Sequence, residues 1–182
     1  MKSGKIFRSF TAKDRRKVVL RTPVWEDLDD FLELINSFIE ERADILRTEK
    51  VSRDEEIDFL SRVLSRLEKD EMFYLVAEVD GKVVAVSEIS KRSGYEKHVG
   101  VIGIAIRSEF RDLGIGTEMM NALVEQAQEM GLKVLTLTAF AANKPAIHVY
   151  EKVGFLQTGR IPKKHFKDGK YIDEIIMTKL LE

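Results

Sequence analysis

Two glycines in a short loop near the middle of the 182-residue chain form the most informative stretch of the sequence. The apolar run VGVIGIAI (99–106) predicts a strand, and EMMNALVEQAQEM (118–130) has the period of a helix. Gly114 and Gly116 lie between them and leave the backbone amides open to a ligand. Because the first N–H groups of a helix have no intrahelical partner and lie at the positive end of its dipole, the loop is predicted to bind a phosphate-like anion.

Two other kinds of glycine loop are excluded by the residues that follow. A P-loop needs Lys and then Ser or Thr after its last glycine, whereas Gly116 is followed by Thr117 and Glu118. A dinucleotide-binding loop needs three glycines and an acidic residue at the end of the next strand. Residues 111–116 contain two glycines, and the strand predicted at 134–138 ends without an acid.

The motif R-x-x-G-x-G at 111–116 resembles the pyrophosphate-binding loop of the GCN5-related N-acetyltransferase (GNAT) family. Downstream, AANKPAIHVYEKVGF (141–155) resembles the family's asparagine, alanine-rich helix and Tyr-x-x-x-Gly-Phe. The order of predicted strands and helices is similar to the family's from Val18 to Leu181. The resemblance implies that acetyl-CoA is the cosubstrate and lies in a splay between two parallel strands, the first of which is 99–106.

The resemblance also implies which residues hold this cofactor. Amides of the first strand would pair with the pantetheine arm, those of the loop would hold the pyrophosphate, and an asparagine side chain would contact the arm. The residues concerned are Ile104, Ala105, Ile106, Arg111, Asp112, Leu113, Gly114, Ile115, Gly116, Thr117 and Asn143. Asp112 departs from the family pattern, because an acid beside a pyrophosphate is unfavourable unless its side chain points to solvent. Asn143 is also suited to cap a helix.

A catalytic tyrosine is implied in the same way. Tyr150 resembles the family tyrosine whose hydroxyl faces the departing sulfur, where a phenol can donate a hydrogen bond to the thiolate. A core aromatic ring packed beside Phe155 is the alternative interpretation of Tyr150.

The general base is left open. At the two positions where relatives carry a glutamate, this chain has Gly100 and Thr138. Glu88 and His98 are the candidate substitutes, acting directly or through a water, and a histidine has a pKa suited to this chemistry. A structural or surface role remains the alternative for each.

Elements around the loop follow from periodicity and turn signals. The run Val18 to Leu20 predicts a strand, and Thr22-Pro23 predicts the start of a helix. A second helix is predicted to start at Ser52, because Glu55 follows at the spacing of a capping box. Hairpins are predicted to turn at 80–81 and 168–169. The predicted order is β, α, α, β, β, β, α, β, α, β, β, a single-domain α/β (α+β) chain. The family resemblance implies a GNAT-like fold with a central mixed, twisted sheet flanked by helices.

Charge is distributed unevenly along the chain, although the net charge is −1. Residues 1–21 carry eight Lys or Arg against Asp14 but no helix that could read a nucleic acid, so we expect no nucleic-acid partner. Residues 1–16 are predicted to be a loosely ordered basic arm, and residues 17–182 the N-acetyltransferase domain. Residues 22–71 carry sixteen acids against seven bases, which favours a cationic acceptor, with a solvated helix face as the alternative.

Composition excludes several kinds of chemistry. Without cysteine the chain has no thiol nucleophile, so a thiol acyl-enzyme is excluded. The three histidines are too dispersed to indicate a metal site. No apolar run approaches the ~20 residues of a membrane span, and no secretory signal is recognised, so we expect no membrane partner and a cytoplasmic location.

The sequence therefore predicts an acetyl-CoA-dependent N-acetyltransferase that acts by direct transfer to an amine. The acceptor, a small molecule or a protein or peptide amine, is undefined, and a homodimer is left open. A non-catalytic acyl-CoA-binding module of the same fold is the alternative, suggested by the missing glutamates.

Overall fold

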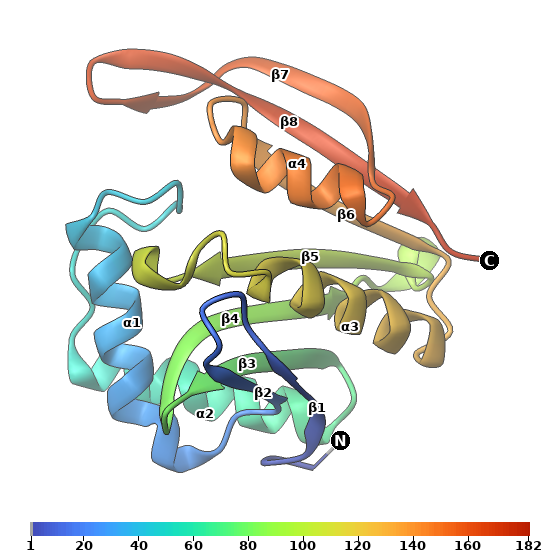
Figure 1. The fold of residues 1–182 in the computed structure, drawn as a ribbon. Helices are drawn as coiled ribbons and strands as arrows, with labels where there is room; N and C mark the ends of the chain where they lie inside the picture. The colour runs from blue at the N-terminus through green and yellow to red at the C-terminus, as the bar shows by residue number, and fades with distance from the viewer. Residues whose placement is uncertain (1) are drawn as a thin grey trace.

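The computed structural model describes residues 2–182 as a long sheet with helices on both faces (Figure 1). The strands are β1 (Ile6–Thr11), β2 (Lys17–Arg21), β3 (Met72–Val79), β4 (Lys82–Lys91), β5 (Val99–Ile106), β6 (Val134–Phe140), β7 (Leu156–Lys167) and β8 (Lys170–Leu180). The helices are α1 (Leu28–Glu40), α2 (Arg53–Glu68), α3 (Ile115–Glu129) and α4 (Lys144–Lys152). Beyond the predicted elements, the structure adds β1.

The sheet has eight strands in the order β1-β2-β3-β4-β5-β6-β8-β7, and it is antiparallel except between β5 and β6. Those two parallel strands pair only at Val99–Val134, Gly100–Leu135 and Val101–Thr136. Beyond Val101 the two strands diverge, which is the splay that the family resemblance implied. The predicted fold class is confirmed.

Helices cover the two faces of the sheet in pairs. Helices α1 and α2 pack on one face, over a cluster that includes Phe31, Leu60 and Tyr74. Helix α3 packs on the other face, over a larger cluster that includes Met119 and Leu135, and α4 lies beside it (Figure 1). Strand β3 is buried along almost its whole length, because helices cover both of its faces. The splay between β5 and β6 therefore opens toward α1 and α2 on one side and toward α3 and α4 on the other.

The helix starts agree with the sequence at α2 and differ at α1. Ser52 caps α2, since its hydroxyl accepts from the N–H of Glu55 at 3.3 Å and the Glu55 carboxylate accepts from the N–H of Ser52 at 2.9 Å. Thr22 does not cap α1, because its Oγ1 accepts from the N–H of Lys5 at 2.8 Å. A 3₁₀ turn at Trp25–Asp27 precedes α1 instead, and the Asp27 carboxylate accepts from the N–H of Val24 at 2.9 Å.

The prediction of a loosely ordered arm over residues 1–16 is wrong for residues 6–11, which form β1 against β2. Phe7 packs edge-to-face on the buried Phe73 at 5.0 Å, and Arg8 forms an ion pair with Glu118 of α3 at 3.0 Å. The sequence obscured this strand, because the charged residue within it, Arg8, pairs with partners more than a hundred residues away.

Candidate active site

The free edge of β5 lies where the cofactor arm was expected. Ile104, Ala105 and Ile106 are half-buried, and β4 pairs with them on one side only. Among residues 2–182, no strand pairs with the other side of β5 beyond Val101. The side chains of Ile104 and Ile106 pack against the α3-side core, while Ala105 packs on the α1–α2 side. The main-chain groups of this edge can therefore pair with an amide-containing ligand.

The glycine loop turns into α3 as the motif predicted. Gly114 is the N-cap of α3 with φ of 90°, a left-handed conformation that favours glycine. Ile115, Gly116 and Thr117 form the first turn, so their N–H groups have no partner inside the helix. A Cβ atom added at Gly114 would meet nothing within 4 Å, which shows that the space in front of these amides is open.

Arg111 shapes the loop with its side chain. Its Nε donates to the carbonyl oxygen of Ile106 at 2.9 Å, and its guanidinium forms an ion pair with Glu41, the C-cap residue of α1. Its own N–H donates to the carbonyl of Ser108 at 3.2 Å and is not free for a ligand. Asp112 is exposed to solvent.

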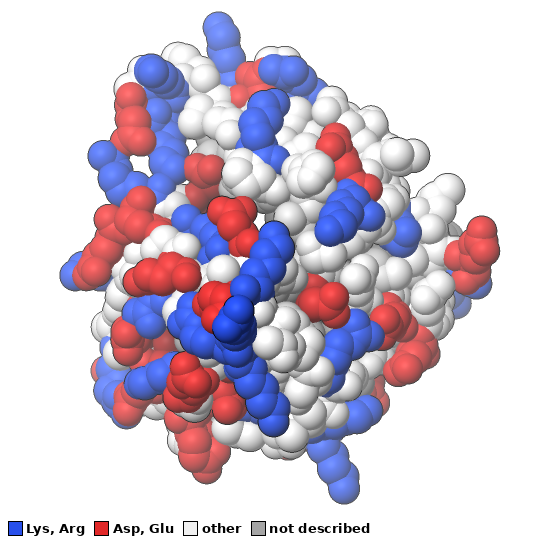
Figure 2. Space-filling model, in the orientation of Figure 1, with Lys and Arg blue, Asp and Glu red and all other residues white. Residues whose placement is uncertain are grey.

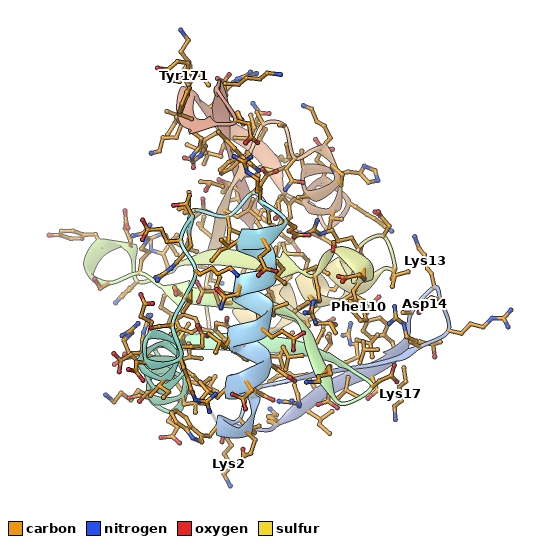
Figure 3. All side chains as sticks on the ribbon, turned by 90° about the vertical axis from the view of Figure 1, so that its left-hand side faces the viewer. Lys2, Lys13, Asp14, Lys17, Phe110 and Tyr171 are labelled. Atoms are coloured by element: carbon orange, nitrogen blue, oxygen red, sulfur yellow. The ribbon has the colours of Figure 1, made fainter. Side chains whose placement is uncertain are left out.

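The β1–β2 turn supports the loop from the other side. The N–H of Lys13 donates to the carbonyl of Leu113 at 3.2 Å, and the Arg16 guanidinium lies over the ring of Phe110 at 4.3 Å. Figure 3 shows Lys13, Asp14 and Phe110 close together on this side of the molecule. Residues near the N-terminus therefore help to position the glycine loop.

Helix α4 presents the asparagine and tyrosine of the motif. Asn143 is the N-cap of α4, and its Oδ1 accepts from the N–H of Ala146 at 3.2 Å, which leaves its NH₂ group for a ligand. Tyr150 is 7% exposed and lies 6.5 Å from the ring of Phe155. Burial raises the pKa of Tyr150 to about 12, so the phenol keeps its proton at neutral pH. Its hydroxyl makes no hydrogen bond within the described part of the chain.

Glu88 lies on the face of the sheet that α1 and α2 cover. On β4 it lies between Tyr74 of β3 and Gly103 of β5, its partners on the two neighbouring strands. A Cβ atom added at Gly103 would lie 3.6 Å from Glu88 Oε1, so the carboxyl lies over the β5 backbone just beyond the point of divergence. Burial raises the pKa of Glu88, partly opposed by Arg66.

The other candidate positions for a base are unsuitable for different reasons. His98 is exposed and precedes β5 at the end where β5 and β6 are paired, so it is not near Glu88. A Cβ atom at Gly100 would lie 2.8 Å from Ile89 and Leu132, which leaves no room for a side chain. Thr138 is exposed on β6 and carries no acid. The geometry favours Glu88 over His98.

Sequence reasoning missed a pocket of about 400 Å³ between α1, α2, β3 and β4. Phe31, Phe59 and Tyr74 line it with ring centroids 5.9–6.4 Å apart, and Glu56 of α2 also faces it. Because Tyr74 is the cross-strand neighbour of Glu88, the pocket lies on the same face of the sheet as that carboxyl. Apolar periodicity cannot distinguish the wall of a pocket from a packed core, since both have the same pattern.

A second hollow, of about 420 Å³, separates the segment after α1 from the β7–β8 hairpin. Lys167 forms an ion pair with Asp44 at 2.5 Å, and Arg42 forms another with Asp168, so the hairpin tip is tied to the segment before α2. Both hollows are lined by Phe38 and Arg47, and they are therefore neighbours. Figure 3 shows the segment after α1 reaching toward the hairpin that carries Tyr171.

No further chemistry emerges outside this region in residues 2–182. No group of three or more metal-ligating side chains occurs among them, and none of their helices is long and apolar enough to cross a membrane. Figure 2 shows basic and acidic residues side by side over much of one face.

The site has the features of a protein that uses an acyl-CoA. These are the free edge of β5 at the splay, the open glycine loop at the start of α3 and the tyrosine of α4. The model of the acetyltransferase (GNAT) family matches residues 29–155, and the chain belongs to this family. It is an acetyl-CoA-dependent N-acetyltransferase, as the sequence predicted.

Two curated relatives illustrate the likeness. The chain is 32% identical over 108 residues to the L-amino acid N-acetyltransferase AaaT of Escherichia coli, covering 58% of this chain and 67% of that protein. It is 25% identical over 163 residues to the phosphinothricin N-acetyltransferase of Streptomyces viridochromogenes, covering 88% of this chain and 86% of that one.

A solved structure supports the fold. The acetyltransferase yncA of Salmonella typhimurium, determined with its cofactor acetyl-CoA, superposes with a TM-score of 0.80. The match covers 91% of this chain and 94% of that one at 20% identity, and at this identity it shows the shared fold.

Proposed function

We propose that this protein acetylates the amine of a small molecule, with Glu88 as the general base and Tyr150 as the donor to the leaving sulfur. The observation that carries the proposal is the position of Glu88 over Gly103, at the point where β5 leaves β6. The pocket beside Tyr74 lies on the same face of the sheet and has the volume of a small-ligand site.

The donor side of the site is built by the chain's own main-chain groups. Acetyl-CoA supplies the acetyl group as a thioester. The free edge of β5 at 104–106 would hold the pantetheine arm, and the free amides between Asp112 and Thr117 would hold the pyrophosphate. The NH₂ group of Asn143 is free to contact the arm.

Two proton movements remain for side chains. The acceptor ammonium must lose a proton before its nitrogen can attack, and the Glu88 carboxylate accepts that proton directly or through a water. As the C–N bond forms and the C–S bond breaks, the nitrogen gives up its second proton and the sulfur leaves as a thiolate. Tyr150 donates a hydrogen bond to this thiolate, or its phenolic proton, which the second proton of the nitrogen then replaces. Because burial holds the pKa of Tyr150 at about 12, this hydroxyl is protonated and ready to donate.

A small acceptor is favoured over a protein by two observations. The β7–β8 hairpin is tied to the segment before α2 by the pairs Lys167–Asp44 and Arg42–Asp168, which narrows the approach to the pocket. The two curated relatives are named for an amino acid and for phosphinothricin, both small amines. A cytoplasmic location and a homodimer stay predictions.

Release of free thiol from acetyl-CoA tests the proposal. The protein is incubated with small amines, including amino acids and diamines, and with peptides that have a free N-terminus. We expect thiol release with a small amine and little with the peptides. Faster release with peptides would contradict the small acceptor, and tight acetyl-CoA binding without release on any amine would favour a non-catalytic acyl-CoA-binding module.

A further inference from the structure

The pocket between α1 and α2 contains a buried carboxyl group that has no hydrogen-bond or ion-pair partner within the described chain. Glu56 is 4% exposed and lines the pocket. Its side chain makes no hydrogen bond and no ion pair within residues 2–182. A buried carboxylate is costly unless it is paired, so an unpaired one that faces a cavity indicates a cationic ligand.

The neighbouring basic side chains form no ion pair with Glu56; burial raises the pKa of this carboxyl, and Arg47 only partly opposes the rise. Arg47 lines the same pocket, but its guanidinium is 2.5 Å from Glu55 Oε1 in an ion pair on the rim. Arg62 also lines the pocket and is exposed to solvent, as is Asp58. The exposed residues at the rim therefore carry charges of both signs, whereas the buried ionisable group of the pocket, Glu56, is acidic.

Aromatic rings complete the surroundings of this carboxyl group. Phe31, Phe59 and Tyr74 line the pocket together with Glu56, and a cation near such rings is stabilised by their π electrons. Glu56 and Glu88 both act on the pKa of the Tyr74 phenol, which burial and these two carboxyls raise. Tyr74 is therefore close to both the candidate base and the buried carboxyl of α2.

We propose that the acceptor carries a second cationic group, which binds to Glu56 among the rings of Phe31, Phe59 and Tyr74 while the reacting amine lies at Glu88. The acceptor class is a diamine or an amino compound with a second basic group. This inference rests on the proposed function, since it names the acceptor of that same site.

A matched pair of amines tests the inference with the intact protein. 1,5-Diaminopentane and 1-aminopentane have the same chain length and differ by one positive charge. We expect kcat/KM for the diamine to exceed that for the monoamine by about tenfold to a hundredfold, the effect of one charge-assisted hydrogen bond in a buried site. Lysine and norleucine form a second pair with the same difference.

Two variants assign the preference to the carboxyl group. In Glu56→Gln the ratio between diamine and monoamine is expected to fall to near one. Asp54→Asn is the control, because it removes one charge from an exposed position of the same helix outside the pocket, and it should leave the ratio unchanged. Calorimetry with 1,5-diaminopentane, in the presence of CoA, measures the same dependence on Glu56 without turnover.

The outcomes separate this inference from the proposed function. Two results would contradict the binding of a second cationic group at Glu56: equal rates of acetylation for diamine and monoamine, or a preference for the diamine that persists in Glu56→Gln. Neither result would contradict the N-acetylation of small amines. Absence of thiol release with every amine would instead count against the proposed function. Diamine binding that is lost in Glu56→Gln but kept in Asp54→Asn would still support the cation site.

Discussion

At the level of single residues, the proposed roles of Glu88 and Tyr150 require two different protonation states. A raised pKa suits both roles. Burial raises the pKa of Glu88, and a carboxylate with a raised pKa is a stronger base for an ammonium proton. Burial also raises the pKa of Tyr150 to about 12, which keeps the phenol protonated. The two side chains approach the splay from different elements, β4 and α4.

Replacing Glu88 by glutamine is expected to lower kcat by about 10²–10⁴-fold, because the amide cannot accept the amine proton. In the unmodified protein the active form is the ionised carboxylate, so activity is present above the pKa of Glu88 and is lost as pH falls through it. Since burial raises this pKa, the acidic limb should lie at a higher pH than an exposed glutamate would give. A pH–rate profile of kcat measures this limb. If Glu88→Gln had the same kcat and the same acidic limb as the unmodified protein, the general base would be another group.

Tyr150→Phe is expected to lower kcat by about 10²-fold while the dissociation constant of acetyl-CoA changes little. Because the hydroxyl makes no hydrogen bond within the described chain, the melting temperature should also change little. Tyr171→Phe is the control, since Tyr171 is 66% exposed on the β7–β8 hairpin. An unchanged rate in Tyr150→Phe would leave Tyr150 with a packing role beside Phe155.

At the level of elements, the glycine loop is held in place from two sides. Arg111 connects it to the C-terminal end of α1 through Glu41, and Lys13 connects it to the β1–β2 turn through the carbonyl of Leu113. These contacts fix the start of α3, while the amides of its first turn stay free. The loop is therefore anchored to two other elements while the first amides of α3 have no partner inside the helix.

Gly114→Asp is expected to raise the dissociation constant of acetyl-CoA at least about tenfold. The substitution places a carboxylate in the open space before the free amides and forces a non-glycine residue to a φ of 90°. Gly81→Asp is the matched control, because Gly81 has a φ of 76° and open surroundings in the β3–β4 turn, far along the chain from the loop. Calorimetry on both variants separates an effect at the loop from the general effect of an aspartate at a positive φ, and equal affinities would show that the pyrophosphate binds elsewhere.

At the level of the whole molecule, the N-terminal strand closes one edge of the sheet and links it to α3. Arg8 forms ion pairs with Glu118 at 3.0 Å and Glu125 at 2.7 Å, and Phe7 adds a ring contact to Phe73 of β3. The ion pairs are partly exposed and contribute little individually, so the ring contact is expected to dominate.

Phe7→Ala is expected to lower the free energy of unfolding by about 1–3 kcal/mol, less than for a fully buried ring because Phe7 is only half-buried. Ile6→Ala is the control on the neighbouring residue, whose side chain is 63% exposed, and it should change the stability by less than about 0.5 kcal/mol. Denaturant unfolding measures both. Equal small effects would mean that β1 contributes little to stability.

Much of the fold was predictable because its signals are local. Ser52 and Glu55 form the expected capping box, and the hairpins turn where Asp-Gly pairs occur, at 80–81 and 168–169. The start of α1 was not predictable in this way, because the hydroxyl of Thr22 bonds to the N–H of Lys5, seventeen residues earlier. Local capping preferences fail where a distant backbone group competes for the same side chain.

The sequence by itself determined the donor side of this protein. The loop at 111–117 and the helix from Asn143 to Tyr150 are continuous segments, and a left-handed glycine or a helix N-cap is decided by a few neighbouring residues. Only the tertiary structure decided the acceptor side. Strand register places Glu88 between Tyr74 and Gly103, and the packing of α2 directs Glu56 into the pocket, because side chains far apart in the chain meet only once the sheet and helices are assembled.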